Sequence, residues 1–129
     1  MGAQKSKNMK IEKVNIAEKL NQIQDLWNPR IVGELNGQHV KLTKANGEFT
    51  WHKHDNEDEM FLIIKGNFKM ELRDKTIEVK PGEFIIIPKG VEHRPVTDGE
   101  AQVLLFEPAG TLNTGNVKNE FTKETLEKI

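Results

Sequence analysis

The sequence predicts an all-β fold, an antiparallel double-stranded β-helix (jelly roll) with a short N-terminal helix. Short stretches of strand-forming residues alternate with turn signals, and no long helical block separates them. The length of 129 residues suits one domain, which buries about two thirds of its unfolded surface. The chain shows no internal repeat, so we expect one barrel.

We expect three segments along the chain: an N-terminal arm at 1–14, the barrel at 15–110 and a C-terminal tail at 111–129. Gly2 and Ser6 formally match a myristoylation pattern. A second plausible start at Met9 follows closely, so we interpret the first residues as an extension rather than an anchor. Without a leading hydrophobic segment, the expected compartment is the cytoplasm.

A helix is expected directly after the arm, over residues 15–27. Asn15 is a suitable N-cap, and Asn28-Pro29 ends the pattern. The apolar residues at helical spacing are Ile16, Leu20, Ile23 and Trp27. We expect this apolar face to pack on the outside of the barrel.

The strands follow the helix in order. They are expected at residues 30–35, 38–45, 59–65, 67–72, 76–79, 84–87 and 101–107. Asn36-Gly37 predicts a hairpin turn, and Asn46-Gly47 gives a second turn signal. In the tail, residues 121–129 have the pattern of a short closing helix. The apolar residues expected to touch the barrel from this helix are Phe121, Leu126 and Ile129.

Three of the strands carry apolar residues on both faces, at 60–64, 84–87 and 103–106. A half-exposed antiparallel strand would alternate, so we expect both faces to be covered. One face lines the barrel interior, and the other packs on the second sheet, the terminal segments or another subunit. We expect a homodimer to provide part of this cover.

The composition excludes several classes of partner and chemistry. A net charge of −1, from 19 basic and 20 acidic residues, gives no electrostatic signature of nucleic-acid or anionic-membrane binding. No apolar run approaches the roughly 20 residues of a membrane span. The absence of cysteine excludes disulfides, thiolate ligands and cysteine nucleophiles. The expected partner is therefore a small-molecule ligand or substrate.

Two short blocks of the sequence carry side chains that suit a metal ion. His52 and His54 lie two apart on a strand, so both rings face the same side, about 6.7 Å apart along it. Residues 55–58 have turn chemistry, and we expect a bend there that brings Glu59 inward on the next strand. His93 arrives from a separate strand after Pro88-x-Gly90.

Together these blocks resemble the motifs of the cupin superfamily, G-x5-H-x-H-x3,4-E-x6-G and G-x5-P-x-G-x2-H-x3-N. The similarity covers residues 47–97. It departs from the family pattern twice: only four residues separate Gly47 from His52, and Thr97 stands where Asn is usual. Neither departure touches a ligand position. The resemblance implies a cupin barrel with a metal site at His52, His54, Glu59 and His93.

Three neutral imidazoles and one carboxylate would leave one positive charge on a divalent ion and at most two open positions. This set suits one divalent transition metal ion, Mn, Fe, Ni, Co, Cu or Zn, and affinity alone does not choose among them. His39 lies outside the motifs. Other candidates near the site are Glu107, Arg94, Trp51 (expected to face away) and the apolar residues Phe49, Phe61, Ile63, Met70, Phe84, Ile86 and Phe106.

Three functional classes remain open at this stage. The first is a metal-dependent enzyme acting on a small polar molecule, with dioxygenase-like chemistry slightly favoured because the ligand set resembles that of cupin dioxygenases. The second is a sugar or sugar-phosphate isomerase similar to phosphomannose isomerase, although that enzyme has a different metal set. The third is a non-catalytic ligand-binding or sensing cupin. The scaffold hosts many chemistries, so the sequence does not identify the substrate.

Overall fold

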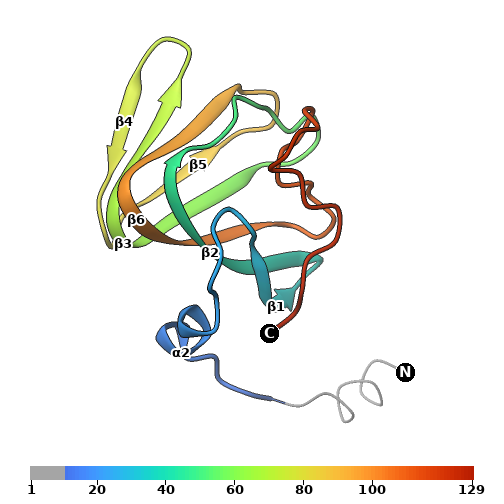
Figure 1. The fold of residues 1–129 in the computed structure, drawn as a ribbon. Helices are drawn as coiled ribbons and strands as arrows, with labels where there is room; N and C mark the ends of the chain where they lie inside the picture. The colour runs from blue at the N-terminus through green and yellow to red at the C-terminus, as the bar shows by residue number, and fades with distance from the viewer. Residues whose placement is uncertain (1–10) are drawn as a thin grey trace.

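The computed structural model describes residues 11–129 and shows an antiparallel β-barrel with one short helix outside it (Figure 1). The predicted all-β fold with an N-terminal helix is thereby confirmed. The first ten residues of the expected arm, including the myristoylation pattern, lie outside the described residues. Residues 11–14 are exposed and have no regular structure.

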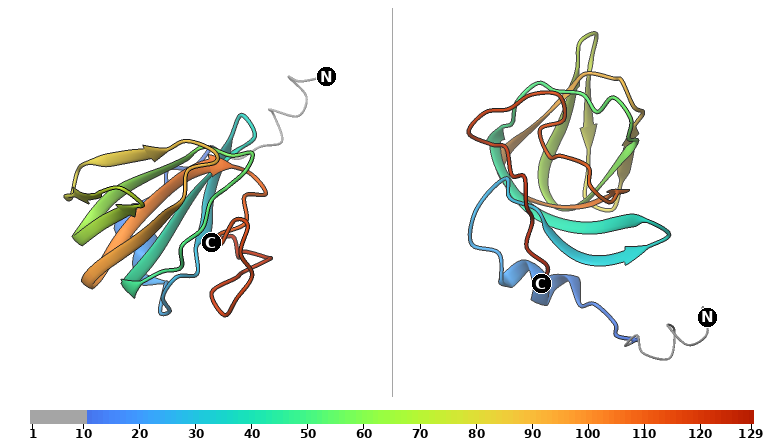
Figure 2. Two further views of the ribbon diagram at one scale, coloured as in Figure 1. Left: turned by 90° about the horizontal axis from the view of Figure 1, so that it is seen from above. Right: turned by 90° about the vertical axis from the view of Figure 1, so that its right-hand side faces the viewer.

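The barrel is built from six strands, all paired antiparallel. They are β1 (Arg30–Leu35), β2 (Gln38–Glu48), β3 (Glu59–Leu72), β4 (Thr76–Val79), β5 (Phe84–Ile87) and β6 (His93–Pro108). Their order in the sheet is β1-β2-β6-β3-β4, and β5 pairs with the first residues of β3. In Figure 2 these strands curve around a common interior. The longest strands, β3 and β6, therefore lie side by side at the centre of the sheet.

Two of the predicted strand breaks are β-bulges inside longer strands. The turn expected at Asn46-Gly47 is a register shift within β2, which continues to Glu48. The break expected after Lys65 is a similar irregularity within β3, at Gly66. Extra residues bend a strand and increase its twist without ending it. These turn-forming residues therefore curve the sheet into a barrel.

The helix α2 (Ile16–Asn21) is shorter than predicted. Asn15 is its N-cap, as expected, and its Oδ1 accepts a hydrogen bond from the Glu18 backbone N–H at 3.0 Å. The prediction is wrong for residues 22–27, because contacts with β2 compete with the helix there. The backbone N–H of Trp27 donates to Lys44 O at 2.8 Å, and its indole N–H donates to Asn46 O at 3.1 Å.

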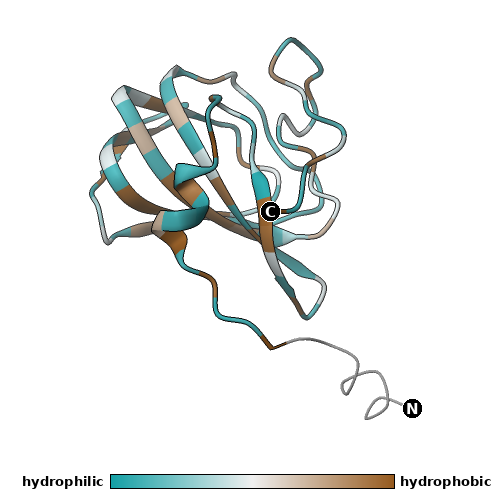
Figure 3. Cartoon of the chain, turned by 60° about the horizontal axis from the view of Figure 1, so that its bottom comes forward, coloured by the Kyte–Doolittle hydropathy of each residue, from teal (hydrophilic) through white to brown (hydrophobic). Residues whose placement is uncertain are grey.

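The sheet carries an apolar layer on each face. The inner layer fills the barrel with Phe61, Ile63, Phe68, Met70, Val79, Ile87, Val103 and Leu105. The outer layer joins α2 to the sheet through Leu20, Ile23 and Leu42, with Val32, Ile64, Leu104 and Ile129 around them. Figure 3 shows the helix against apolar bands of the strands. Within the described part of the chain, no helix is long and apolar enough to cross a membrane.

The tail after β6 contains no helix, in contrast to the prediction for residues 121–129. Its last residues instead pair with β1: Ile31 N–H donates to Glu127 O at 2.8 Å, and Ile129 N–H donates to Ile31 O at 3.0 Å. Nine residues form a marginal helix, so strand pairing and side-chain packing decide the conformation. Phe121 and Ile129 nevertheless contact the body, as expected.

Candidate metal centre

The segment before β3 carries two of the four predicted ligands, and β6 carries a third. His52 and His93 form an antiparallel bridge, in which the His52 N–H donates to His93 O at 3.1 Å and the His93 N–H donates to His52 O at 2.9 Å. Their ring centroids are 4.3 Å apart. His54 lies two residues beyond His52, and its ring centroid is 5.0 Å from that of His52.

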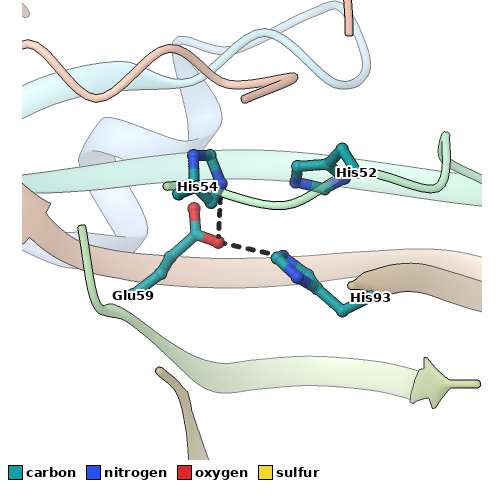
Figure 4. A group of neighbouring side chains, drawn as sticks. All are labelled: His52, His54, Glu59 and His93. Carbon is teal, nitrogen blue, oxygen red and sulfur yellow. Dashed lines mark hydrogen bonds and ion pairs between the residues drawn. The ribbon is translucent and has the colours of Figure 1, made fainter. Parts of the chain in front are cut away.

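Glu59 completes the cluster as the first residue of β3. Its Oε1 lies 3.2 Å from His54 Nε2 and 3.2 Å from His93 Nε2 (Figure 4). One ligand atom from each of the four residues lies within 4.8 Å of the others, and all four side chains are buried. The fold therefore brings together all four residues that the sequence motifs predict.

Backbone carbonyls orient two of the rings. His52 Nδ1 lies 2.9 Å from Thr50 O, and His93 Nδ1 lies 2.9 Å from Val91 O. An Nδ1–H that donates to a carbonyl leaves the lone pair on Nε2, the atom that faces the cluster. This second hydrogen bond is the usual way in which proteins prepare a histidine to bind a metal ion.

His54 is held differently from the other two histidines. Its backbone carbonyl accepts a hydrogen bond from Gly90 N–H at 2.7 Å, which ties it to the turn of the second motif. Both of its ring nitrogens are buried and make no well-formed hydrogen bond, although Nε2 is close to Glu59. Buried polar atoms without partners are rare in native proteins. A ligand bond to an ion would satisfy His54 Nε2.

The protonation states of His52 and Glu59 suit a divalent cation. Burial, and then the neighbouring His93, lower the pKa of His52 to about 4. Burial would raise the pKa of Glu59, but the adjacent rings of His54 and His93 hold it well below its ordinary value. The pKa of His54 is raised, because the carboxylate of Glu59 outweighs the effect of burial. Metal binding needs neutral imidazoles and an ionised carboxylate, which His52 and Glu59 already provide at neutral pH.

A narrow cavity of about 40 Å³ lies beside the cluster and is walled mainly by apolar side chains. Phe49 and Phe61 line it, as the sequence predicts. Residues that the sequence analysis did not single out also line it: Trp27, Pro29, Thr43, Ala45, Phe68, Pro95, Val103, Leu105 and Asn113. The sequence feature that could have identified these residues is the alternation of apolar residues on the inner strand faces. This alternation does not distinguish residues that line a cavity from residues that fill the core.

Several predicted wall residues lie elsewhere. Ile63 and Met70 belong to the inner core, while Phe84 and Ile86 point outward and are 60% and 54% exposed. The expectation that both faces of residues 84–87 are covered is therefore wrong for the isolated chain. The register explains this: the inward residues of β5 are Ile85 and Ile87, which join the inner core. Phe106 is half-buried and outside the lining.

The remaining candidates differ in whether they line the cavity. Arg94 pairs with Glu71 at 2.7 Å and takes no part in the cavity. Trp51 lies outside it too, with the Arg73 guanidinium 3.9 Å from its ring centroid. His39 is outside the cluster, 3.6 Å from Glu34. Among these candidates, only Glu107 lines the cavity.

Glu107 forms a buried ion pair that the sequence analysis missed. Lys41 Nζ lies 2.5 Å from Glu107 Oε2, and both side chains are 2% exposed. Burial and the adjacent Glu59 raise the pKa of Glu107 well above its ordinary value, while Lys41 acts in the opposite direction. Lys41 lies between Val40 and Leu42 in a strand. The sequence would predict that this lysine is buried only if both faces of the strand were already known to be covered.

The C-terminal segment of residues 111–122 covers the metal-binding segment. Lys53 and Asn116 exchange two hydrogen bonds: Lys53 N–H donates to Asn116 Oδ1 at 2.9 Å, and Asn116 N–H donates to Lys53 O at 3.0 Å. Asn119 Nδ2 donates to Thr50 Oγ1 at 3.2 Å. Phe121 packs on Phe49, with ring centroids 5.1 Å apart. Figure 2 shows this red segment across one end of the barrel.

Comparisons with known proteins agree with this arrangement. A protein of Shewanella frigidimarina that contains a cupin-2 domain is 38% identical, with a TM-score of 0.73 over 74% of this chain and 93% of that one. The uncharacterized protein YdbB of Bacillus subtilis is 36% identical over 64 residues, which are 49% of this chain and 57% of that protein. The homogentisate 1,2-dioxygenase of Bradyrhizobium diazoefficiens is 30% identical over 72% of this chain but only 22% of the enzyme.

The similarity is spread over the barrel and both motifs. The family model for the cupin domain matches residues 38–107, more than half of the chain, from the start of β2 almost to the end of β6. This range contains all four residues of the buried cluster. The chain therefore belongs to the cupin domain family and carries a His/Glu cluster that could bind a metal ion.

Proposed function

We propose that this protein is a metal-dependent enzyme that acts on a small polar molecule, with dioxygenase-like chemistry as the leading reaction class. The observation that supports it is the buried set of three histidines and one glutamate beside a small apolar-walled cavity. A divalent transition metal ion in such a set can polarise a bound oxygen atom, activate water or, if redox active, react with dioxygen.

The residues of this chain would prepare the site for that chemistry. His52 and His93 are oriented by backbone carbonyls, so ligand geometry does not have to be assembled when the ion arrives. Glu59 supplies the negative charge that balances part of a divalent ion. Phe49 and Phe61 form part of the apolar wall of the cavity, and an apolar wall strengthens electrostatic contacts beside it.

The preference for dioxygenase-like chemistry has two supports. The ligand set resembles that of cupin dioxygenases, and a homogentisate 1,2-dioxygenase is 30% identical over 72% of this chain. The chain spans only 22% of that enzyme, so the reaction and the substrate are proposals. An isomerase would work without oxygen, and a sensing module would bind a ligand without converting it.

Metal analysis of the purified protein tests the site. The wild type, prepared without added metal or chelating resin, is compared by elemental mass spectrometry with His52→Ala, His93→Ala and the control His39→Ala. We expect about one equivalent of a transition metal in the wild type and the control. We expect at least a tenfold loss in the two ligand variants, because each removes one of four ligands. Stoichiometric metal in both ligand variants would contradict the assignment.

Oxygen consumption then separates the three classes. A dioxygenase holding Fe, Mn, Ni or Cu should take up oxygen with a chelating substrate. An isomerase should turn over anaerobically and tolerate Zn. A binding module should be stabilised by its ligand without any product. Turnover that is unchanged under nitrogen would exclude the dioxygenase.

A further inference from the structure

Two of the residues that line the cavity beside the cluster are partly exposed, Trp27 and Asn113. The other lining residues are buried. A cavity meets the solvent where its wall is exposed, so these two side chains mark its mouth. Both lie outside residues 38–107, which the cupin family model matches. The mouth is therefore built by segments that flank the family barrel.

Trp27 has a backbone conformation that bulky residues rarely adopt. Its φ of +57° lies in the left-handed region. Such a conformation persists only where the surrounding structure holds it, and it is common at functional sites. Here two hydrogen bonds to β2 hold it, from the backbone N–H to Lys44 O at 2.8 Å and from the indole N–H to Asn46 O at 3.1 Å. Figure 1 shows this blue segment, between α2 and β1, looping up against β2.

Side chains on both sides of Trp27 in the sequence brace the same turn. Asn28 Nδ2 donates to Asp25 Oδ2 at 2.9 Å, and the Arg30 guanidinium donates to Asp25 Oδ1 at 2.9 Å. The same guanidinium donates to Asn28 O at 2.6 Å. The indole is therefore a fixed part of the cavity wall.

Aromatic contacts connect Trp27 to a proposed metal ligand. Its ring stacks on Phe49, with centroids 4.9 Å apart and planes inclined by 27°. The ring of Phe49 in turn meets the His52 imidazole edge to face, at a centroid distance of 5.4 Å. All three residues line the cavity. Trp27 and Phe49 therefore form a continuous aromatic wall from the mouth to the cluster.

The cavity is small, and the side chains at its mouth already have partners within the protein. One water needs about 10 to 15 Å³ on the same measure, so a cavity of about 40 Å³ holds only a few non-hydrogen atoms. Asn113 Nδ2 donates to Phe121 O at 2.8 Å, and Asn113 Oδ1 accepts from the Lys123 N–H at 2.9 Å. The bulk of a ligand, more than its hydrogen bonds to the mouth, therefore decides whether it fits.

We propose that Trp27 is a specificity-determining residue that restricts the ligands of the metal cluster to molecules of a few non-hydrogen atoms. Its indole fills the space that the remainder of a larger ligand would occupy. A sugar phosphate exceeds this limit. The inference rests on the proposed metal site and adds the size class of the ligand that the site takes.

The test compares two ligands that coordinate through the same group and differ in bulk. Formate and benzoate are both monocarboxylates, and benzoate carries a phenyl ring in place of a hydrogen atom. The protein is loaded with Co²⁺, its cobalt content is measured, and each anion is titrated against the visible cobalt absorption. We expect the wild type to bind benzoate about tenfold more weakly than formate, or weaker still, the penalty typical of forcing atoms into a filled space.

Variants connect this preference to the indole. Glycine adopts a positive φ freely, so Trp27→Gly removes the side chain without a backbone penalty. Cobalt content and formate affinity should stay as in the wild type, whereas benzoate should bind about tenfold more tightly. Trp27→Phe keeps a smaller ring, and its benzoate affinity should be intermediate. The matched control is Asn36→Gly, because Asn36 has φ of +51° and lies outside the cavity wall. It should keep the wild-type ratio of affinities.

Each other outcome contradicts a specific step. Equal affinities in the wild type, or no binding of either anion at millimolar concentration, would overturn the size limit. An unchanged ratio in both Trp27 variants, or the same change in Asn36→Gly, would show that the indole does not set it. If Trp27→Gly fails to fold, the ratio in Trp27→Phe decides between these outcomes. A wild type that binds no cobalt would refute the metal site itself, and this inference with it.

Discussion

At the scale of single residues, burial and neighbours give His52 and His54 opposite acid–base behaviour. His52 is buried beside His93, and its pKa falls to about 4. His54 is buried too, but it lies 3.2 Å from the Glu59 carboxylate, and its pKa rises. The charge of the nearest side chain, rather than burial alone, therefore decides the direction of each shift.

The depressed pKa of His52 predicts a pH dependence of stability in the metal-free protein. An unfolded His52 takes up a proton below about pH 6.5, whereas the folded one remains neutral down to about pH 4. The unfolded state then binds more protons, so the free energy of unfolding falls as the pH decreases between these values. The pKa difference corresponds to a loss of roughly 3 kcal/mol.

Urea unfolding of chelator-treated protein at pH 7 and pH 4 measures this loss. The His52→Gln variant lacks the group, so we expect it to lose roughly 3 kcal/mol less than the wild type over the same interval. Contributions from His54 and Glu59 are present in both proteins and largely cancel in the comparison. The same loss in wild type and variant would show that His52 is not protected from protonation.

At the scale of elements, the bulge in β3 depends on close contact with β6. Gly66 has φ of +99°, and a Cβ built there would lie 2.6 Å from Glu100 O and 2.7 Å from Ala101 Cα. Both neighbours are backbone atoms, so the strands would have to separate. Only glycine allows the two central strands of the barrel to approach each other at this position.

Gly66→Ala should therefore destabilise the protein by about 3 kcal/mol, since it adds a backbone collision to an unfavourable φ. Gly99→Ala is the control: Gly99 has φ of +79°, but nothing lies within 4 Å of its added Cβ. We expect the control to lose about 1 kcal/mol. Chemical denaturation with matched m-values measures the free energy of unfolding of both variants. Similar losses in the two variants would contradict the role of the close contact between Gly66 and β6.

The C-terminal segment makes a comparable contact with the cluster. A Cβ on Gly115 would collide with the carbonyl oxygen of Lys53 and lie 3.2 Å from His54 Nδ1. This segment follows the part of the chain that the cupin family model matches. It is therefore an addition to the barrel that supports one of the proposed ligands.

Gly115→Ala should weaken metal binding, because it displaces the backbone that carries His54. We expect about a tenfold loss of affinity, the effect typical of disturbing a group that orients a ligand. Gly110→Ala is the control, as it has φ of +87° but no atom within 4 Å of the added Cβ. Competition with a chromophoric chelator measures both affinities. Equal metal affinities in the two variants would show that the C-terminal segment does not support the metal site.

At the scale of the whole molecule, one face of the barrel exposes a group of apolar side chains. Phe84 and Ile86 on β5 point outward and pair across the sheet with Leu62 and Met60. Exposed apolar patches on a soluble chain commonly mark an interface, and a second copy presents the same face. The expected homodimer therefore stays a prediction, and we propose this face as its interface.

Light scattering over micromolar concentrations tests the dimer. The wild type should give twice the mass of one chain, and Phe84→Lys/Ile86→Lys should give the monomer mass with its metal content unchanged. Leu35→Lys is the control, since Leu35 is 48% exposed on the distant edge strand β1. A monomer mass for the wild type would contradict the predicted dimer.

The sequence by itself determined several of the elements and the identities of the clustered residues. The strands at residues 76–79 and 84–87 have the predicted bounds, because turn residues flank short β-branched or aromatic runs. His52, His54, Glu59 and His93 were predictable because their spacing matches the motif. The strand expected to carry His52 and His54 is absent: His52 makes an isolated bridge with His93, and His54 lies in an irregular segment before β3. The Asn15 cap was equally local, since it needs only a hydrogen bond three residues away.

Only the tertiary structure decided features that depend on residues far apart in the chain. Trp27 lies outside the helix because its backbone and indole N–H groups donate hydrogen bonds to carbonyls of β2. The tail pairs with β1 instead of forming a helix. Two apolar side chains of β5 lie outside the barrel. The contact of Lys41 with Glu107, 66 residues apart, depends on the register of β2 against β6. Local propensity cannot specify such pairings, because their free energy comes from packing between strands.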